Sequence, residues 1–415
     1  MSLRFPPPQN VRAAVQGGNP IGGIAGCSAA ARAERSTQER PCPRFPPARS
    51  ARIDFLRGVA IIAVLLHHFS LTYHLADSPL SLIVPAHWVR RAVANGNYGV
   101  TMFFVISGFL ITSNNLRRYG RVGAVDLRQF YAFRFSRIIP PLIPALAVIV
   151  ALGVLEVPSF GNSDGGQRLP ASFFVPAVIS VLTFWHNVLM EKVGYFNYCL
   201  NIYWSLSIEE MFYLTFPLAC VLLKRDRFVA CLCVCAIVIG PVYRSMHRDD
   251  ELYFMYGYAA CFDAIAIGCL TALYCRRFGA GAVANRLTRA AAGVCLGAVY
   301  FAGIDGHEVF GFSAVALCSA FLLVGARDAA PDEKSRRPRT RIVCWFGEHS
   351  YELYLFHIIV LAGMRDFVPK GALAYAYKLP YLALYLLLSA LTAAAVSRYF
   401  AEPANAGLRR ILARR

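Results

Sequence analysis

The sequence predicts an all-α fold, a polytopic membrane helix bundle of about ten transmembrane helices with both termini in the cytoplasm. Its 415 residues are 57% hydrophobic and only 16% charged, and the mean hydropathy is +0.47. A chain with this composition is too apolar to be an ordinary soluble protein. Apolar runs of roughly the length that a helix needs to cross a bilayer recur along the chain.

The basic charge is explained by topology. The formal net charge is +18, but the arginines gather in short segments between apolar runs, where positive charge marks the cytoplasmic side. Nucleic-acid binding is therefore not expected. The 13 cysteines lie mostly inside the apolar runs, without a CxxC pair, and indicate packing residues of a membrane interior. We expect no metal site.

Residues 1–52 differ from the rest of the chain. They are rich in Pro, Gly, Ala and Arg and show no apolar periodicity, which predicts a disordered basic tail. The segment lacks the apolar core of a secretory signal, so a cytoplasmic tail or an over-called start codon would account for it. The membrane domain is expected over 53–401, followed by a short basic cytoplasmic tail, 402–415.

Charge parity decides the number of spans. Apolar runs of membrane length lie near 55–75, 98–113, 138–156, 203–223, 228–244, 254–274, 290–305, 309–325, 342–363 and 380–400. The basic segments between them are 114–137, 224–227, 276–277, 327–341 and the C-terminal ARR. All of these fall on one side only if another apolar stretch, 172–190, does not cross. We expect that stretch to be re-entrant or interfacial.

Arg57 and His68 lie eleven residues apart in one apolar run, RIDFLRGVAIIAVLLHHF. Eleven residues make about three helical turns, so both side chains leave one face, about 16 Å apart along the axis, whereas His67 points about 80° away. Ionisable groups inside a span are costly and typical of a functional site. Alternatively, Arg57 snorkels into the headgroups and His68 is an interfacial histidine.

Two further segments carry charges beside apolar runs. Arg134 and Arg137 in FYAFRFSRIIPP lie one turn apart at the start of a span, where they suit the phosphates of a cytosolic ligand or act only as a positive-inside anchor. Glu209 and Glu210 in WSLSIEEMFYLTFPL project about 100° apart, so at most one readily faces the bundle interior. They could transfer protons or pair with an intramembrane arginine.

Small and polar residues mark two more helices. Ser107 and Gly108 in FFVISGFLIT allow close helix approach or local irregularity. Ser350, Tyr354 and His357 in FGEHSYELYLFHIIV form one polar stripe at helical spacing. That stripe is either a hydrogen-bonding seam between helices or a second wall of a cavity.

Together, five motifs in this order resemble the acyltransferase-3 family of integral-membrane acyltransferases, which modify sugars and other hydroxyl compounds, mostly in bacteria. They are IDFLRGVAIIAVLLHHF, GVTMFFVISGFLIT, FYAFRFSRIIP, WSLSIEEMFYLTFP and SYELYLFH. The family's arginine and histidine, separated by ten residues, fall on Arg57 and His68. The resemblance covers nearly the whole chain after residue 52.

The resemblance implies an O-acyltransferase of the bacterial inner membrane. Its co-substrate would be acyl-CoA, acetyl-CoA first, and its acceptor a hydroxyl of a carbohydrate or lipid-linked glycan. Arg134 and Arg137 would hold the CoA phosphates, with Ser107 and Gly108 in the same donor-binding group, and Arg57 would orient the donor or stabilise developing negative charge.

His68 would be the general base or a transient acyl carrier. Glu209, Glu210 and His357 would orient groups or relay protons, and the substrate cavity would include Ser350 and Tyr354 beside His357. A transporter or flippase of a glycan or acyl donor is the alternative function. It would be expected to show an internal repeat, and we find none.

Three departures qualify the resemblance. Family members often have an acid where Thr101 stands and a second basic residue where Phe133 stands, so details of donor and substrate fit differ here. Some relatives also carry a C-terminal extracytoplasmic hydrolase-like domain. We expect a stand-alone form without it, so that a separate extracytoplasmic partner protein would have to do that work.

Overall fold

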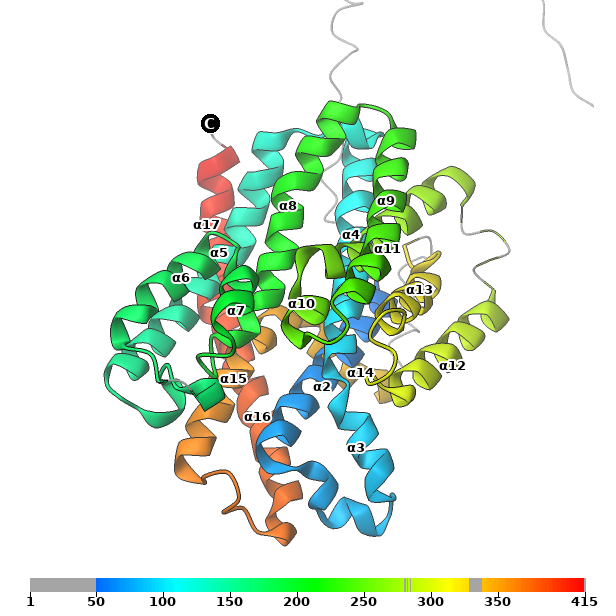
Figure 1. Cartoon of the computed structure of the whole chain (residues 1–415). Helices are drawn as coiled ribbons and strands as arrows, with labels where there is room; N and C mark the ends of the chain where they lie inside the picture. The colour runs from blue at the N-terminus through cyan, green and yellow to red at the C-terminus, as the bar shows by residue number, and fades with distance from the viewer. Residues whose placement is uncertain are drawn as a thin grey trace, which may run out of the picture. The chain divides into compact units, whose positions relative to one another are not determined.

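In the part of the chain that the structure describes, every regular element is helical, which confirms the predicted all-α fold (Figure 1). The computed structural model describes residues 50–166, 168–279, 281, 283, 285–327 and 338–413. The predicted tail, 1–52, lies outside these ranges except for its last three residues.

The helices follow one another along the chain with short connections. They are α2 (Ala51–Tyr73), α3 (Ala86–Ala94), α4 (Gly96–Tyr119), α5 (Leu127–Val154), α6 (Phe174–Leu182), α7 (His186–Val193), α8 (Trp204–Leu223), α9 (Asp226–Met246), α10 (Glu251–Tyr256), α11 (Tyr258–Phe278), α12 (Arg286–Ala302), α13 (Gly311–Leu323), α14 (Pro338–Glu348), α15 (Ser350–Phe367), α16 (Lys378–Val396) and α17 (Glu402–Ala413).

Seven helical stretches among the described residues are long and apolar enough to cross a membrane. They coincide with the predicted runs 55–75, 98–113, 138–156, 203–223, 228–244, 254–274 and 380–400. The other three runs are also helical, but α12 and α13 are shorter, and the third is divided into α14 and α15. The total of ten spans therefore stays a prediction.

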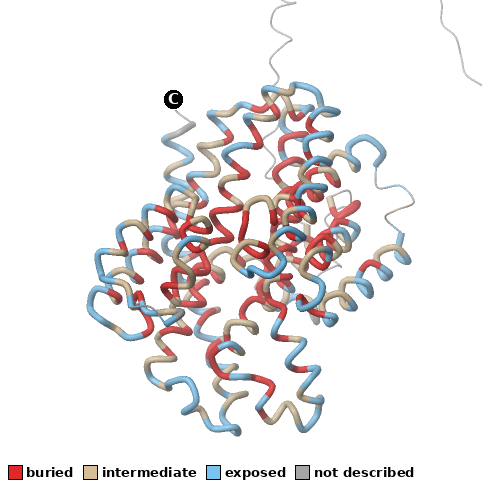
Figure 2. The backbone as a smooth tube through the Cα atoms, viewed as in Figure 1, coloured by how far each residue is buried: buried red, intermediate tan, exposed pale blue. Residues whose placement is uncertain are grey.

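Exposed residues lie along the outside of the bundle (Figure 2). On α9 and α16 many of them are large and apolar, as lipid-facing helices require. On α9 they are Leu232, Val234, Val238, Ile239 and Val242, and on α16 they are Leu384, Leu387, Leu388 and Leu391. The chain is thus an integral, multi-pass membrane protein.

The stretch 172–190 is folded as two short helices instead of one span. Helix α6 has nine residues and α7 has eight, and Phe184 between them has a φ of +66°. Each helix is about 12–14 Å long, less than half the thickness of the hydrocarbon core. This geometry supports the expectation that the stretch does not cross, which stays a prediction.

Predicted basic segments meet at one end of the bundle, at the top of Figure 1. The backbone N–H of Val122, between α4 and α5, donates to Asp226 Oδ1 at the start of α9 (3.3 Å). Arg276 donates to the carbonyl oxygen of Gly120 (3.5 Å), and Arg327 donates to Asn114 Oδ1 (2.7 Å). Their common location favours the predicted topology, with this end in the cytoplasm.

A close crossing of α2 and α14 fixes the helix that carries Arg57 and His68. A Cβ on Gly58 would lie 1.9 Å from the carbonyl oxygen of Val343, and one on Gly347 would lie 1.7 Å from that of Asp54. Only glycine allows two backbones to approach this closely, as at small-residue interfaces of membrane helices.

A buried ion pair that was not predicted from the sequence joins α9, α11 and α13. Arg244, fully buried, donates to Asp263 Oδ2 (2.7 Å) and to Ser313 Oγ (2.6 Å). Ser313 Oγ in turn donates to the same carboxylate oxygen (2.6 Å). Arg244 also donates to the carbonyl oxygens of Val309 and Ala260. The guanidinium thus ties together three helices that are distant in sequence.

The predicted C-terminal tail is helical over its described residues. Five residues in a π-helix, Ser397–Ala401, join α16 to α17, and α17 packs beside α5 (Figure 1). This packing brings the basic residues of α17 close to α5, whose start is predicted to be cytoplasmic.

Candidate active site

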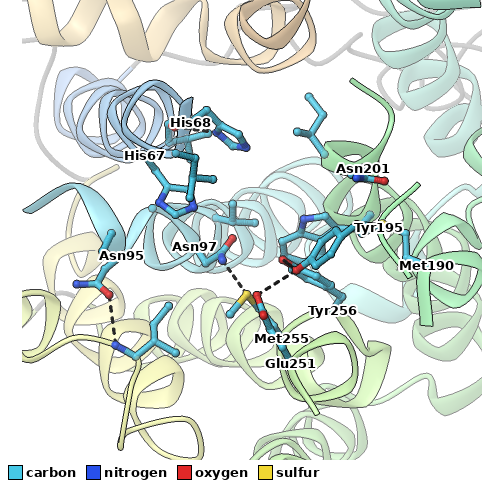
Figure 3. Close-up of a pocket in the computed structure, with 18 of the residues that line it drawn as sticks. His67, His68, Asn95, Asn97, Met190, Tyr195, Asn201, Glu251, Met255 and Tyr256 are labelled. Carbon is cyan, nitrogen blue, oxygen red and sulfur yellow. Dashed lines mark hydrogen bonds between the residues drawn. The ribbon is translucent and has the colours of Figure 1, made fainter. Parts of the chain in front are cut away.

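A cavity of about 760 Å³ lies among the C-terminal half of α2, the start of α4, the segment before α8, α10 and the end of α15. Its walls are polar and aromatic, and they include Asn95, Asn97, Asn201, Tyr195, Tyr198, Trp204 and Tyr256. In Figure 3, His67 and His68 lie on one side and Tyr195, Met255 and Tyr256 on the other. Aromatic rings interleaved with amide and hydroxyl groups suit a hydroxylated, partly apolar ligand.

His68 presents one ring nitrogen for chemistry. Its Nδ1 lies 2.9 Å from the carbonyl oxygen of Val64. Because a carbonyl oxygen only accepts, Nδ1 carries the proton, and the lone pair of the neutral ring is on Nε2. His67 has the same arrangement, with Nδ1 2.9 Å from the carbonyl oxygen of Val93, and it also lines the cavity. An offset of about 80° around the helix therefore does not remove His67 from the cavity.

His357 lies directly against His68. The two ring centroids are 5.0 Å apart, with planes at 65°. His357 Nδ1 lies 2.9 Å from the carbonyl oxygen of Leu353 and 2.8 Å from that of Tyr354, so its lone pair is also on Nε2. That Nε2 is buried without a hydrogen-bond partner among the described residues.

The predicted stripe on α15 faces three different environments. Tyr354 lines the cavity and hydrogen-bonds to Ser205 Oγ and to the carbonyl oxygen of Ile202 (2.7 Å). His357 contacts His68, and Ser350 Oγ accepts a hydrogen bond from Arg57 Nε (3.0 Å). The stripe is thus both a seam between helices and part of the cavity wall.

Arg57 does not line the cavity but joins a second, charged cluster. It interacts electrostatically with Arg137, Asp54 and Glu209. Ser107 Oγ and the Tyr213 hydroxyl both donate to Glu209 Oε1, and the Arg134 guanidinium carbon lies 3.7 Å from the Tyr213 ring centroid. The site residues that were predicted near the cytoplasmic side, Arg57, Ser107, Arg134, Arg137 and Glu209, therefore form one connected group.

Glu210, the second predicted acid, is buried and interacts with the charges of Glu209, Arg134 and Arg137. Gly108 is accounted for by packing, since a Cβ there would lie 2.0 Å from the carbonyl oxygen of Ile265 on α11. This geometry is the close helix approach that the sequence left open. Its place in donor binding stays a prediction.

Two arginines pack on Phe133, the position where family members often carry a basic residue. The guanidinium carbon of Arg118, from α4, lies 4.6 Å from the ring centroid, and that of Arg409, from α17, lies 5.0 Å from it. Arg137 is exposed and interacts with Arg409. Basic groups thus converge on this position from other helices.

Thr72, Tyr198 and Arg365 form a further part of the cavity wall that was not predicted from the sequence. Thr72 follows His68 by four residues, a spacing that would have placed it on the same face of α2. Arg365 is the basic residue near the end of the apolar run that contains His357. Among the described residues, no group of three or more His, Cys, Asp or Glu side chains is placed to hold a metal ion.

The fold and the site define a helical membrane protein with a histidine pair at one cavity and, about three turns from His68 on α2, Arg57 in a charged cluster with residues of other helices. The chain belongs to the acyltransferase domain family, acyltransferase-3, whose model matches residues 50–398. This match confirms the resemblance inferred from the five motifs.

Curated relatives are O-acetyltransferases. The O-acetyltransferase OatA of Staphylococcus aureus (strain NCTC 8325 / PS 47) is 23% identical over 383 residues, which cover 87% of this chain and 57% of the relative. The peptidoglycan O-acetyltransferase OatA of Listeria monocytogenes serovar 1/2a is 31% identical over 166 residues, which cover 40% of this chain and 23% of the relative. The chain thus spans just over half the length of the first relative. No solved structure matches it.

Proposed function

We propose that this protein transfers an acyl group, acetyl first, from cytosolic acyl-CoA to a hydroxyl of a glycan on the outer side of the bacterial inner membrane. One observation carries the proposal: His68 lines a polar cavity, has its lone pair on Nε2 and lies on the same helix as Arg57. The names of the relatives support acetyl as the group and a cell-wall glycan as one class of acceptor.

The donor would bind at the basic end. Arg134 and Arg137 suit the phosphates of CoA, because guanidinium binds phosphate through paired hydrogen bonds. Arg118 and Arg409, packed on Phe133, would add positive charge where many family members have a basic side chain. The convergence of these arginines near the predicted cytoplasmic end favours a polyanionic ligand there.

Arg57 and His68 are too far apart to have the same function in the reaction. About three helical turns, roughly 16 Å, lie between them, so one reacting carbonyl cannot touch both side chains. A donor anchored by its phosphates at Arg134 would reach His68 only through an extended arm, as CoA provides. Arg57, held by Ser350 Oγ and close to Glu209, would orient that donor.

At His68, Nε2 would take the proton from the acceptor hydroxyl as its oxygen attacks the thioester carbonyl. The C–S bond then breaks, and the CoA sulfur leaves as the thiolate and takes up a proton. In the other mechanism, Nε2 attacks the thioester carbonyl first, and the C–S bond breaks as the CoA thiolate leaves. The acceptor hydroxyl then attacks the acyl group on Nε2, the N–C bond breaks, and the hydroxyl proton ends on the CoA sulfur. The Nδ1–H···O=C bond to Val64 serves both mechanisms, since it keeps the lone pair on Nε2.

The test is acetyl transfer from radiolabelled acetyl-CoA in membrane vesicles of the native host. Wild type is compared with His68→Ala and with His87→Ala, an exposed histidine of α3 that does not line the cavity. His67 is a poor control because it also lines the cavity. Label should reach a glycan fraction in wild type and His87→Ala and be lost in His68→Ala at equal protein level. Equal labelling by all three would remove His68 from the chemistry, and no labelling by wild type would favour the transporter alternative.

A further inference from the structure

A wall of connected side chains leads from His68 to Arg365. Thr72 lies one turn beyond His68 on α2, and its Oγ1 is 2.8 Å from the Tyr198 hydroxyl. The Arg365 guanidinium carbon lies 4.8 Å from the centroid of the Tyr198 ring. All four side chains line the same cavity. A ligand whose hydroxyl reaches His68 would therefore extend along Thr72 and Tyr198 towards Arg365.

Arg365 has no acidic partner within 4.0 Å among the described residues. The neighbouring carboxylate, Asp366, does not line the cavity and accepts hydrogen bonds from Ser159 N (3.0 Å) and Ser159 Oγ (2.6 Å). Lys370, which is exposed and follows Arg365 by five residues, also lines the cavity and adds a second cation. The half-buried guanidinium is thus available to a ligand.

The acids that line the cavity are not ion-pair partners of Arg365. Three of the five accept hydrogen bonds from other groups. Asp164 Oδ2 accepts from the Asn201 side-chain amide (2.9 Å), and Glu251 Oε1 accepts from the Tyr195 hydroxyl (3.0 Å). Glu308 accepts from the backbone N–H of Gly306 (2.7 Å). The remaining two, Asp249 and Asp305, form no ion pair with Arg365 within 4.0 Å among the described residues.

The intervening wall is suited to sugar hydroxyls. Burial raises the pKa of Tyr198 above the usual tyrosine range, so its hydroxyl stays protonated and can donate as well as accept. Thr72 supplies a second hydroxyl beside it. This stretch can therefore hold a hydroxylated ring between the reacting group and a charged substituent.

We propose that Arg365, with Lys370, forms an anion-binding subsite for the acceptor, which carries a carboxylate or phosphate close to the hydroxyl that receives the acyl group. Guanidinium recognises both anions through paired hydrogen bonds. The two sources are the carboxylate of an acidic sugar and the phosphate of a lipid-linked sugar. The inference rests on the proposed function for the role of His68.

Direct binding tests the subsite without acyl transfer. The purified protein in nanodiscs is titrated with methyl glucuronide, glucose 1-phosphate and methyl glucoside, and binding is followed by thermal shift and by tryptophan fluorescence, since Trp204 lines the cavity. We expect at least one anionic probe to bind roughly tenfold or more tightly than the neutral glucoside. Preference for the glucuronide would indicate an acidic sugar, and preference for the phosphate a lipid-linked one.

Variants assign the preference to Arg365. Arg365→Gln should abolish it, and Arg365→Lys should retain part of it. Arg91→Gln is the matched control, because Arg91 also packs on an aromatic ring, Trp88, but lies outside the cavity. Lys370→Gln changes an exposed side chain, so it should fold normally and weaken anion binding by a few-fold.

Two results would overturn the subsite. The first is equal binding of anionic and neutral probes by the wild type. The second is an unchanged anion preference in Arg365→Gln, with Lys370→Gln taking its place if Arg365→Gln does not fold. Failure of the proposed function is a separate result. If the proposed function is wrong and the subsite is right, anions still bind through Arg365, but His68→Ala transfers label as well as the wild type does.

Discussion

The imidazole of His357 packs edge to face against that of His68, with ring centroids 5.0 Å apart. Each ring directs Nδ1 to a backbone carbonyl oxygen of its own helix, which leaves both lone pairs on Nε2. His68 lines the cavity, whereas His357 is fully buried behind it. In the proposed mechanism, His357 would position His68 and stabilise the proton that His68 receives.

Replacing His357 with phenylalanine, which keeps a ring at the contact, should lower kcat for acetyl transfer by roughly 10- to 100-fold, less than the roughly 10²–10⁴-fold typical of a direct proton-transfer group. The KM for acetyl-CoA should change little, because the proposed donor site is at Arg134. Initial rates in vesicles at varied acetyl-CoA measure both constants. His349→Phe, on the stacked pair of His349 and Trp345, serves as the control. An unchanged kcat in His357→Phe would leave His357 a packing residue only.

Arg409→Ala should raise the KM for acetyl-CoA by several-fold to roughly tenfold, since a charge-assisted contact to phosphate is lost, with a smaller effect on kcat. Arg410→Ala changes the adjacent exposed arginine, which does not pack on Phe133, and should match the wild type. The same vesicle assay at varied acetyl-CoA measures the difference. Equal KM values for the two variants would place the donor elsewhere.

The sequence predicted what depends on local pattern. Apolar runs located the long helices, and the spacing of Arg57 and His68 placed both on one helix, α2. Partners from distant segments were not predictable, because periodicity shows which face of a helix is buried but not what packs against it. Arg244 and Asp263 therefore went unnoticed as a pair, and so did the wall from Thr72 through Tyr198 to Arg365.

Arg244→Met should destabilise the protein strongly, by about 3–5 kcal/mol, because it leaves the Asp263 carboxylate buried without its counter-charge. The double variant Arg244→Met/Asp263→Leu should recover much of that loss, since neither charge then remains buried. Thermal unfolding in detergent of the wild type, both single variants and the double variant measures the coupling. Additive losses in the double variant would contradict an energetic link between the two side chains.

Gly58→Ala should destabilise the α2–α14 crossing, because its new Cβ would meet the carbonyl oxygen of Val343 at 1.9 Å and force the helices apart. Overpacking of this kind costs about 1–3 kcal/mol. The shift should also displace the adjacent Arg57 from Ser350 and lower acetyl transfer. Gly293→Ala on α12 is the matched control, since nothing lies within 4 Å of its Cβ and alanine favours a helix. Its melting temperature should equal or exceed that of the wild type. If both variants have the melting temperature of the wild type, the close approach at Gly58 does not hold α2 in place.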